Sequence, residues 1–338
     1  MRLLRRPLTR VRRALMRVLS DYFPAVEQRR QAERVARLAR DIERLRGIAD
    51  SRPNLQIQIT CSGRLDGAGG QALSVISALA FADNHHCRYL HTPFRGVSHV
   101  KGDPESWTRQ WEIFFGFGEG EASVPADAEI MPVRRFARLC RRAPSYVPAQ
   151  RLVVQAESFG YGEFSKRDMT RLTLRLRAKY HSSDKSAIPL HRMAGAVNIV
   201  IHVRRGDVQE GFFRYMPDAP ILGTIAQLRA AFESLGMAAA FHVYSEGAAE
   251  DFRPYSEAGC LLHLSTDTFE TFHNMVAADI LVPAPSAFSW AAALLSEAIV
   301  LAPNPDWGVR DRWLTRAADG TFDQARLVDM LAAKGRRY

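Results

Sequence analysis

From residue 55 onward, short apolar runs alternate with longer amphipathic stretches, and glycine, proline or polar residues separate them. Short runs rich in Val, Ile and Leu are typical of buried strands in a parallel sheet, whereas the stretches between them have helical spacing. The first series predicts strands at Leu55–Thr60, Cys87–His91 and Arg151–Gln155 and helices at Ala72–Asp83 and Ser165–Tyr180.

A second series of the same kind begins with the strand Val197–His202. It continues with predicted strands at 241–245, 261–264, 279–282 and 299–302 and helices at 221–235, 268–277, 288–297 and 323–334. The polar segment 181–196 between the series is the predicted linker. We therefore expect an α/β protein with Rossmann-like domains at 51–185 and 186–338, each a mostly parallel sheet with helices on both faces. Ligands of such folds bind at the carboxyl ends of the strands.

Residues 104–118 are rich in aromatic side chains. Packing in a core is their expected role because aromatic rings bury large areas, and lining a sugar site is the alternative. The residues concerned are Trp107, Trp111, Phe114, Phe115 and Phe117.

Residues 1–50 form a basic helical extension. They hold 14 arginines and 6 acidic residues, a net charge of +8. Apolar residues at helical spacing among the arginines of 1–20 predict an amphipathic helix. This helix either attaches the protein peripherally to an anionic membrane surface at the cytoplasmic face or packs on the body with its arginines in solvent. A second helix over 25–47, with Val35, Leu38, Ile42 and Leu45 in a stripe, predicts a helical hairpin or a dimer seam.

Charge and cysteine usage restrict the classes of function. The whole chain carries +10, so the body after residue 50 carries only 10 − 8 = +2, which gives nucleic-acid binding no support. No apolar run approaches the ~18 residues of a membrane span. The four cysteines are far apart and form no C-x-x-C pair, which favours a reducing, cytoplasmic compartment over disulfides or a zinc site. Without HExxH or Asp-x-Asp, we expect no catalytic metal and no cofactor.

The first candidate motif is the glycine-rich segment 63–71 between a predicted strand and helix, in which Gly67, Gly69, Gly70 and Gln71 stand close together. Glycines let backbone N–H groups approach an anion, and a helix start adds a favourable dipole. The segment also matches a loose dinucleotide pattern, but the acidic residue expected about 20 positions later is missing, which disfavours an NAD-linked enzyme. A bare tight turn is the alternative.

The second motif, at 202–207, leaves a buried strand directly into a loop. Arg204 and Arg205 are adjacent and so point to different sides, which lets one address a ligand while the other pairs with Asp207 or the backbone. A guanidinium suits diphosphate oxygens and stabilises the charge that a diphosphate leaving group gains. A purely structural Arg–Asp pair is the alternative.

The third motif spans 271–290, where a helix leads into a strand that opens with Asp279 and then into a small-residue loop that opens a helix. Ser286, at or near the N-cap, is placed to bind a phosphate through its hydroxyl and the helix N–H groups. Asp279 is a candidate acceptor for a base or ribose. Ordinary helix capping is the alternative for Ser286.

Together the three segments resemble the fucosyltransferase superfamily of α1,2-, α1,6- and protein O-fucosyltransferases. His202, Arg204, Arg205 and Asp207 match its H-x-R-R-x-D motif, and 288–290 look like the F-S-W ending of α1,2 members. The resemblance implies a GT-B fold and an inverting, metal-independent transferase that uses GDP-fucose in glycan biosynthesis. It implies that one arginine holds the β-phosphate, that His202 and Asp279 contact the nucleoside, and that Ser286 lies near the phosphates.

The resemblance also extends to Ser245 and Ser289 as donor-binding residues and to Glu210 as the catalytic base, because α1,6 members carry a glutamate in a similar stretch. Two departures leave the linkage and the sugar open. The glycine loop reads GAGGQ where α1,2 members have G-x-G-N-Q, and Ser245 is followed by Glu246-Gly247 in place of two aspartates. A transferase for another nucleotide sugar and a non-catalytic glycan-binding protein therefore remain alternatives, and the acceptor is an unspecified glycan.

Overall fold

The computed structural model describes residues 32–43, 56–61, 66–142, 151–159, 170–210, 214–303 and 312–335. The basic segment 1–20 lies outside these residues, so its two predicted roles stay predictions. None of the described helices is both long and apolar enough to cross a bilayer.

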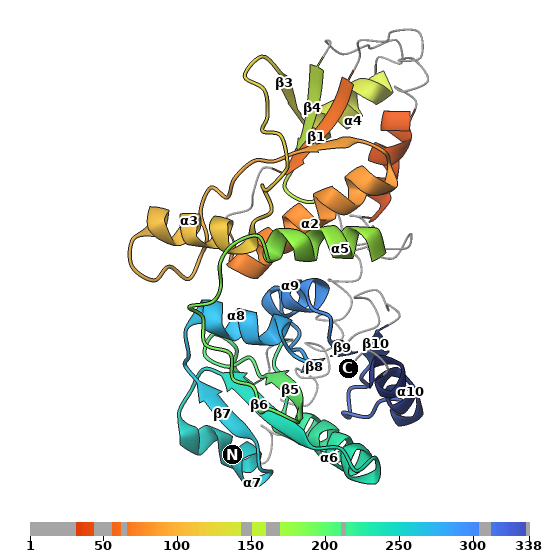
Figure 1. Ribbon diagram of the computed structural model, residues 1–338. Helices are drawn as coiled ribbons and strands as arrows, with labels where there is room; N and C mark the ends of the chain where they lie inside the picture. Colours follow the sequence, from red (N-terminus) through yellow and green to blue (C-terminus); the bar gives the residue numbers. More distant parts are fainter. Residues whose placement is uncertain are drawn as a thin grey trace, which may run out of the picture. The chain divides into compact units, whose positions relative to one another are not determined.

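The chain forms two compact units that are not contiguous in sequence (Figure 1). Unit 1 comprises Met1–Arg64, Ser74–Phe94 and Gly120–Asp168, and unit 2 comprises Leu65–Leu73, Arg95–Glu119 and Met169–Tyr338. The helix Ala68–Asn84 is divided between them: residues 68–73 group with unit 2, and residues 74–84 group with unit 1. Each unit is built on its own sheet.

Unit 1 contains a four-stranded parallel sheet in the order β2-β1-β4-β3. Its elements are β1 (Gln56–Cys61), most of α2 (Ala68–Asn84), β2 (Arg88–Leu90), β3 (Glu129–Pro132), α4 (Val133–Arg142) and β4 (Arg151–Ala156). Residues 32–43 are helical, and Val35, Leu38 and Ile42 are buried within the single chain. This apolar stripe therefore does not provide the exposed surface that the predicted dimer seam needs at these positions.

Unit 2 contains a six-stranded parallel sheet in the order β10-β9-β8-β5-β6-β7. The strands are β5 (Val197–His202), β6 (Ala239–Ser245), β7 (Leu261–Leu264), β8 (Ile280–Val282), β9 (Ile299–Ala302) and β10 (Trp313–Thr315). The helices are α3 (Pro104–Phe115), α5 (Thr170–Tyr180), α6 (Asp218–Ser234), α7 (Arg253–Glu257), α8 (Thr268–Val276), α9 (Ala287–Leu295) and α10 (Gln324–Gly335), and a 3-10 turn spans Ala249–Phe252. The predicted α/β architecture with two parallel sheets is confirmed.

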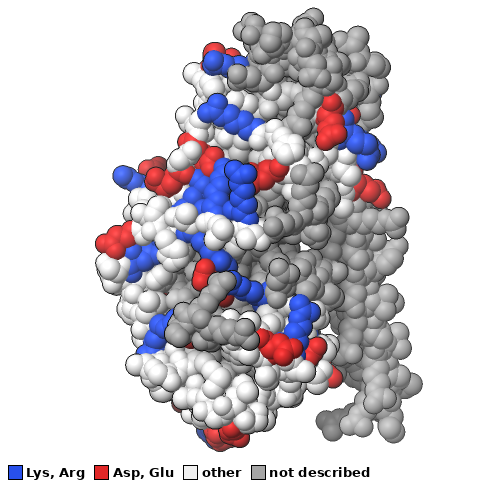
Figure 2. All heavy atoms as spheres, turned by 45° about the vertical axis from the view of Figure 1, so that its right-hand side comes forward, with Lys and Arg blue, Asp and Glu red and all other residues white. Residues whose placement is uncertain are grey.

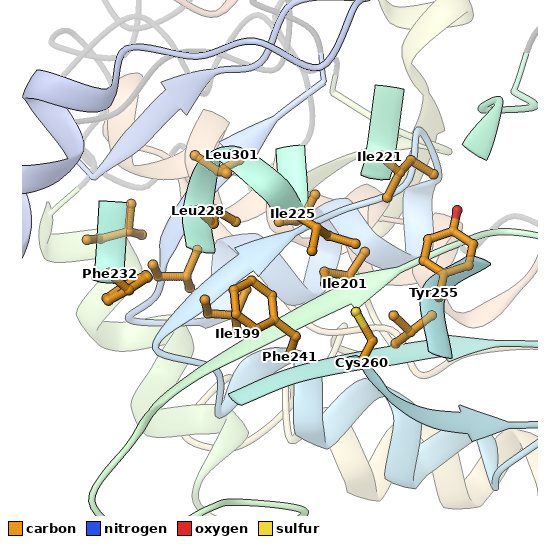
Figure 3. Close-up of a cluster of buried hydrophobic side chains, with 14 of the residues drawn as sticks. Ile199, Ile201, Ile221, Ile225, Leu228, Phe232, Phe241, Tyr255, Cys260 and Leu301 are labelled. Atoms are coloured by element: carbon orange, nitrogen blue, oxygen red, sulfur yellow. The ribbon is translucent and has the colours of Figure 1, made fainter. Parts of the chain in front are cut away.

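Successive side chains of β5 point to opposite faces of the unit 2 sheet. Ile199 and Ile201 point into a buried cluster with Ile221, Ile225 and Leu228 of α6 (Figure 3). His202 points to the opposite face, where it meets α9. Helices therefore cover both faces, as expected for a parallel sheet whose strands are apolar throughout.

The aromatic residues of α3 pack as core, which confirms the expected role. Trp111 lies with its ring centroid 4.2 Å from Phe269 of α8, and Phe115 lies 5.3 Å from Phe272. Asp103 caps the helix by accepting from the Ser106 N–H, and Gly116 ends it in the left-handed conformation. This cluster fixes α3 and α8 against each other within unit 2.

The charged side chains of the described residues are dispersed on the face that Figure 2 shows. Lys and Arg form several separate groups there, with Asp and Glu between them. A continuous basic stripe, which a nucleic-acid-binding surface needs, is not seen among the described residues of this face.

Candidate functional site

His202 ends β5 and makes the first link between two of the sequence motifs. Its Nδ1 lies 2.5 Å from the Ser289 hydroxyl, and that hydroxyl lies 3.1 Å from the Ser286 hydroxyl. Ser286 is the N-cap of α9, accepting from the Ser289 N–H at 3.1 Å. The predicted capping of α9 by Ser286 is therefore observed, and the start of α9 lies beside the carboxyl end of β5.

Arg204 and Asp207 form a bidentate ion pair in the loop after β5. Arg204 Nε and Nη2 donate to the two carboxylate oxygens of Asp207 at 3.0 and 2.5 Å. These hydrogen bonds lower the pKa of the Asp207 carboxyl, although its burial opposes the shift. Two donors of Arg204 thus orient the guanidinium, whereas Nη1 has no hydrogen-bond partner among the described residues.

Arg205 points elsewhere, as expected for the second of two adjacent arginines. Its Nη2 donates to Asp218 at 2.6 Å and to the Met216 carbonyl at 3.0 Å, and its guanidinium stacks on Tyr215. Asp218 also accepts from the Tyr255 hydroxyl at 2.7 Å. Arg205 therefore joins the start of α6 to the loop, whereas the Arg204 guanidinium is paired with Asp207 and leaves Nη1 available to a ligand.

Gly69 places the glycine-rich motif beside the start of α9, next to the carboxyl end of β5. A Cβ at this position would lie 2.4 Å from the backbone N and Cα atoms of Phe288, so only glycine allows the first turn of α2 to reach the first turn of α9. Two helix N-termini therefore meet beside the end of β5. Because the N-terminal dipole end of a helix favours anions, this junction is suited to phosphate oxygens.

The neighbours of Gly69 hold the segment in shape. Asp66 accepts from the Gly67 N–H at 2.8 Å and occupies the space that a Cβ on Gly70 would need. Gln71 is fully buried, and its amide donates to the Gly96 carbonyl. The structure therefore shows contacts through which Gly70 and Gln71 shape the loop, and their predicted binding of the donor stays a prediction.

Replacing Gly69 with alanine is expected to separate the two helix starts. The added Cβ would meet backbone atoms, which cannot give way as a flexible side chain does, so the free energy of unfolding should fall by roughly 1–3 kcal/mol. Thermal unfolding measures this. Gly67→Ala is the matched control, since its Cβ would meet only the His99 ring, at 3.5 Å. Equal stability of the two variants would refute the close approach.

His99 belongs to the site, and the sequence analysis missed it. A parallel bridge between Asp66 and Val97, with Ser98 N–H donating to the Asp66 carbonyl, places it against the glycine-rich segment. His99 also contributes to the lowered pKa of the Asp207 carboxyl, so it lies near both the first and the second motif. With φ at +59°, it adopts a conformation that few non-glycine residues take, and such residues gather at functional sites. That unusual backbone is a signal that only the structure provides.

Three further residues, two of them candidates from the sequence, lie in or next to the loops that follow β5 and β6. Ser245 is buried and donates to the Val203 carbonyl at 2.6 Å, which ties β6 to the loop after β5. The Glu246 carboxylate occupies the space beside Gly206, whose φ is +77°. Glu210 is exposed three residues beyond Asp207. The structure thus gives Ser245 a structural contact and places a carboxylate, Glu246, that was not among the candidates.

Asp279 is not brought to this cluster. It precedes β8 and accepts from the Asn198 N–H at 2.9 Å and from Arg192 at 3.0 Å. Asn198 is the second residue of β5, whereas His202 is its last. Because β5 and β8 are parallel, Asp279 lies at the amino edge of the sheet, opposite the edge where His202 lies. The expectation that Asp279 contacts the same ligand as His202 is therefore corrected.

Three histidines of unit 2 are held neutral by their surroundings. Burial lowers the pKa of His202 to about 4, assisted by Arg204. Burial also lowers the pKa of His263 and of His273 to about 4, with neighbouring basic groups acting in the same direction. Since the unfolded chain binds these protons near pH 6.5, protonation favours unfolding below that pH.

Stability is therefore expected to be complete above about pH 6.5 and to fall as the pH is lowered toward 5. Urea unfolding at pH 7.5, 6.0 and 5.0 measures the trend. His273 accepts or donates a hydrogen bond with Tyr180 at 2.8 Å, so His273→Gln keeps a polar partner while removing the titration. This variant should show a shallower pH dependence, and an unchanged slope would contradict the assignment.

No family model and no curated protein matches the sequence. Among solved structures, the chain is similar to the fucosyltransferase NodZ from Bradyrhizobium, at 14% identity over 71% of this chain and 94% of that one, with a TM-score of 0.39. A mutant of Arabidopsis thaliana FUT1 in complex with GDP matches at 14% identity, 82% and 81% coverage and a TM-score of 0.38. E. coli ADP-heptose LPS heptosyltransferase II matches at 12% identity, 82% and 98% coverage and a TM-score of 0.32. Similarity at this level assigns the chain to no family.

Proposed function

We propose that this protein is an inverting, metal-independent glycosyltransferase that transfers a sugar, fucose from GDP-fucose, to a glycan acceptor. One observation carries the proposal: three motifs far apart in sequence meet at the carboxyl edge of the unit 2 sheet. Gly69 reaches Phe288 of α9, Ser289 of α9 reaches His202, and Arg204 follows His202 in the chain. This edge is where ligands of parallel α/β sheets bind.

The chemistry of this junction suits a diphosphate. Two helix starts present backbone N–H groups, and Arg204 adds a guanidinium that Asp207 orients. Negative charge grows on the diphosphate as the bond to the sugar breaks, and preorganised donors at that point lower the barrier. Arg204 is therefore the residue we assign to the β-phosphate, with Ser286 and Ser289 at the start of α9 beside it.

His202 is assigned to the nucleoside side of the donor. It stays neutral at physiological pH because burial keeps its pKa at about 4. A neutral imidazole presents a donor and an acceptor, and the hydrogen bond with Ser289 fixes the ring. Because His202 is uncharged, it adds no positive charge to the donor site that would slow release of the nucleotide diphosphate product.

Hydrolysis of a panel of GDP- and UDP-sugars by the purified full chain tests the proposal. GDP-fucose should be turned over and bind tightest, and activity should persist in EDTA because Arg204 and two helix starts neutralise the diphosphate. A preference for another nucleotide sugar would keep the reaction class and replace the sugar. A strict Mn²⁺ or Mg²⁺ requirement, or no binding of any nucleotide sugar, would refute the mechanism.

A further inference from the structure

Arg316, which follows β10 at the carboxyl edge of the unit 2 sheet, is a buried cation with almost no partner among the described residues. Its backbone N–H donates to the Ala302 carbonyl at 2.7 Å, which fixes the residue beside β9. The side chain is only 4% exposed. Of its guanidinium nitrogens, Nη2 contacts the Met216 sulfur at 3.4 Å, whereas Nε and Nη1 are buried without a hydrogen-bond partner among the described residues.

Such an arrangement is costly for the folded protein. A thioether is a weak acceptor, so the Met216 contact does not replace the water that the guanidinium has lost. Burial lowers the pKa of Arg316 to about 10, with the nearby Tyr255 opposing the shift, and the group is still charged at neutral pH. Arg177 of the same unit also has a buried Nε without a partner, but its charge is balanced, because its Nη1 lies 3.1 Å from the Glu297 carboxylate. A buried charge without a hydrogen-bonded counterion is costly and needs an explanation, and an anion that completes the site is one such explanation.

The surroundings of Arg316 support this explanation. Met216 contacts both arginines, since its carbonyl accepts from Arg205 and its sulfur contacts Arg316. The carboxylate that balances Arg205 is Asp218, which also accepts from Tyr255. The ring of Tyr255 lies in the hydrophobic cluster (Figure 3). Among the described residues, the contacts named above thus join two guanidinium ions and one carboxylate, a group with a surplus of one positive charge.

We infer that Arg316, together with Arg205, forms an oxyanion subsite that binds one negatively charged group, a phosphate or a carboxylate. The Arg205–Asp218 pair, with side chains 16% and 36% exposed, is the part of the group that solvent reaches. An oxygen that accepts from the unpartnered Nε and Nη1 of Arg316 supplies the missing negative charge. A guanidinium binds phosphate and carboxylate oxygens in the same bidentate way. The inference holds whether or not the protein transfers a sugar.

Arg316→Met tests the inference because it keeps the length of the side chain and removes the charge. Isothermal titration of the full chain with inorganic phosphate, pyrophosphate and glucuronate measures anion binding, and thermal unfolding measures stability. The wild type should bind at least one of these anions, and Arg316→Met should bind it about tenfold more weakly or worse, the loss expected for one charge-assisted hydrogen bond. Binding of glucuronate alone would assign the subsite to a carboxylate, and binding of the phosphates alone would assign it to a phosphate.

The sign of the stability change separates a ligand site from a structural role. Without bound anion, Arg316→Met should unfold at a higher temperature than the wild type because an unbalanced buried charge is gone. Arg316→Lys keeps a charge without the planar fork, so it should lose affinity without this gain. Arg312→Met, an exposed position just before β10, should change neither property. A less stable Arg316→Met, unchanged anion affinity in that variant, or a wild type that binds none of the three anions would overturn the inference.

Discussion

Replacing Arg204 with lysine is expected to lower turnover of the nucleotide sugar by about 10²–10³, and alanine should do no better. The structure singles out Arg204 because its Nε and Nη2 are held by Asp207 while the residue stands next to His202. A lysine ammonium is a point charge and cannot use one edge for Asp207 and another for a diphosphate. Steady-state kinetics with the preferred donor measure the effect as kcat/KM.

Arg205→Lys is the matched comparison for Arg204→Lys. Arg205 is bound to Asp218, to the Met216 carbonyl and to the Tyr215 ring, so its loss should lower the unfolding temperature more than Arg204→Lys does. A folded Arg204→Lys enzyme with near-wild-type kcat/KM would remove this residue from the assignment. If Arg205→Lys alone abolished turnover without loss of stability, the roles of the two arginines would be exchanged.

The features predicted correctly are those that depend on residues close together in the sequence, such as strand ends and helix caps. The apolar run of β5 and the polar residues that follow it placed His202 and Arg204 at a strand end, and the structure agrees. Ser286 was expected at a helix start because a hydroxyl before a run of small residues is a common N-cap, and it accepts from the Ser289 N–H. Each inference depends on residues within one or two turns of each other.

Non-local contacts decided the features that the sequence did not reveal. His99 sits in an irregular segment and reaches the site only because Val97 bridges to Asp66, a contact between residues 31 positions apart. Several of the elements that were not predicted are short or polar: β3 and β10 have four and three residues, and half of the residues of α4 are arginines. Such segments take their structure from the sheet or core they join, which overrides propensity.

Asp279 shows how a motif can mislead when its position along a strand is neglected. In a parallel sheet, a residue before a strand and a residue after it lie at opposite edges. Asp279 precedes β8 and His202 ends β5, so the two were never able to share one small ligand at the strand ends. The register Ile199 to Ile280 makes the separation explicit.

The catalytic base is expected to be Glu210, and Glu210→Gln should lower kcat by about 10²–10⁴, because a positioned carboxylate takes the proton of the acceptor hydroxyl during transfer. Glu210 is exposed on the loop that carries Arg204 and Asp207, so a glycan hydroxyl can approach it. The amide of glutamine has nearly the same shape but cannot accept that proton at neutral pH. Transfer to a glycan, measured apart from donor hydrolysis, reports the loss.

Glu246→Gln is the matched control because the structure places a second carboxylate within reach of the same loop. Glu246 packs beside Gly206, where a Cβ would lie 2.1 Å from its Oε2, so it is the more confined of the two acids. If Glu210 is the base, Glu246→Gln should keep most of its transfer activity and retain donor affinity. Should Glu246→Gln lose transfer while Glu210→Gln stays active, the proton goes to the acid at the end of β6, and the loop after β5 serves only to hold the donor.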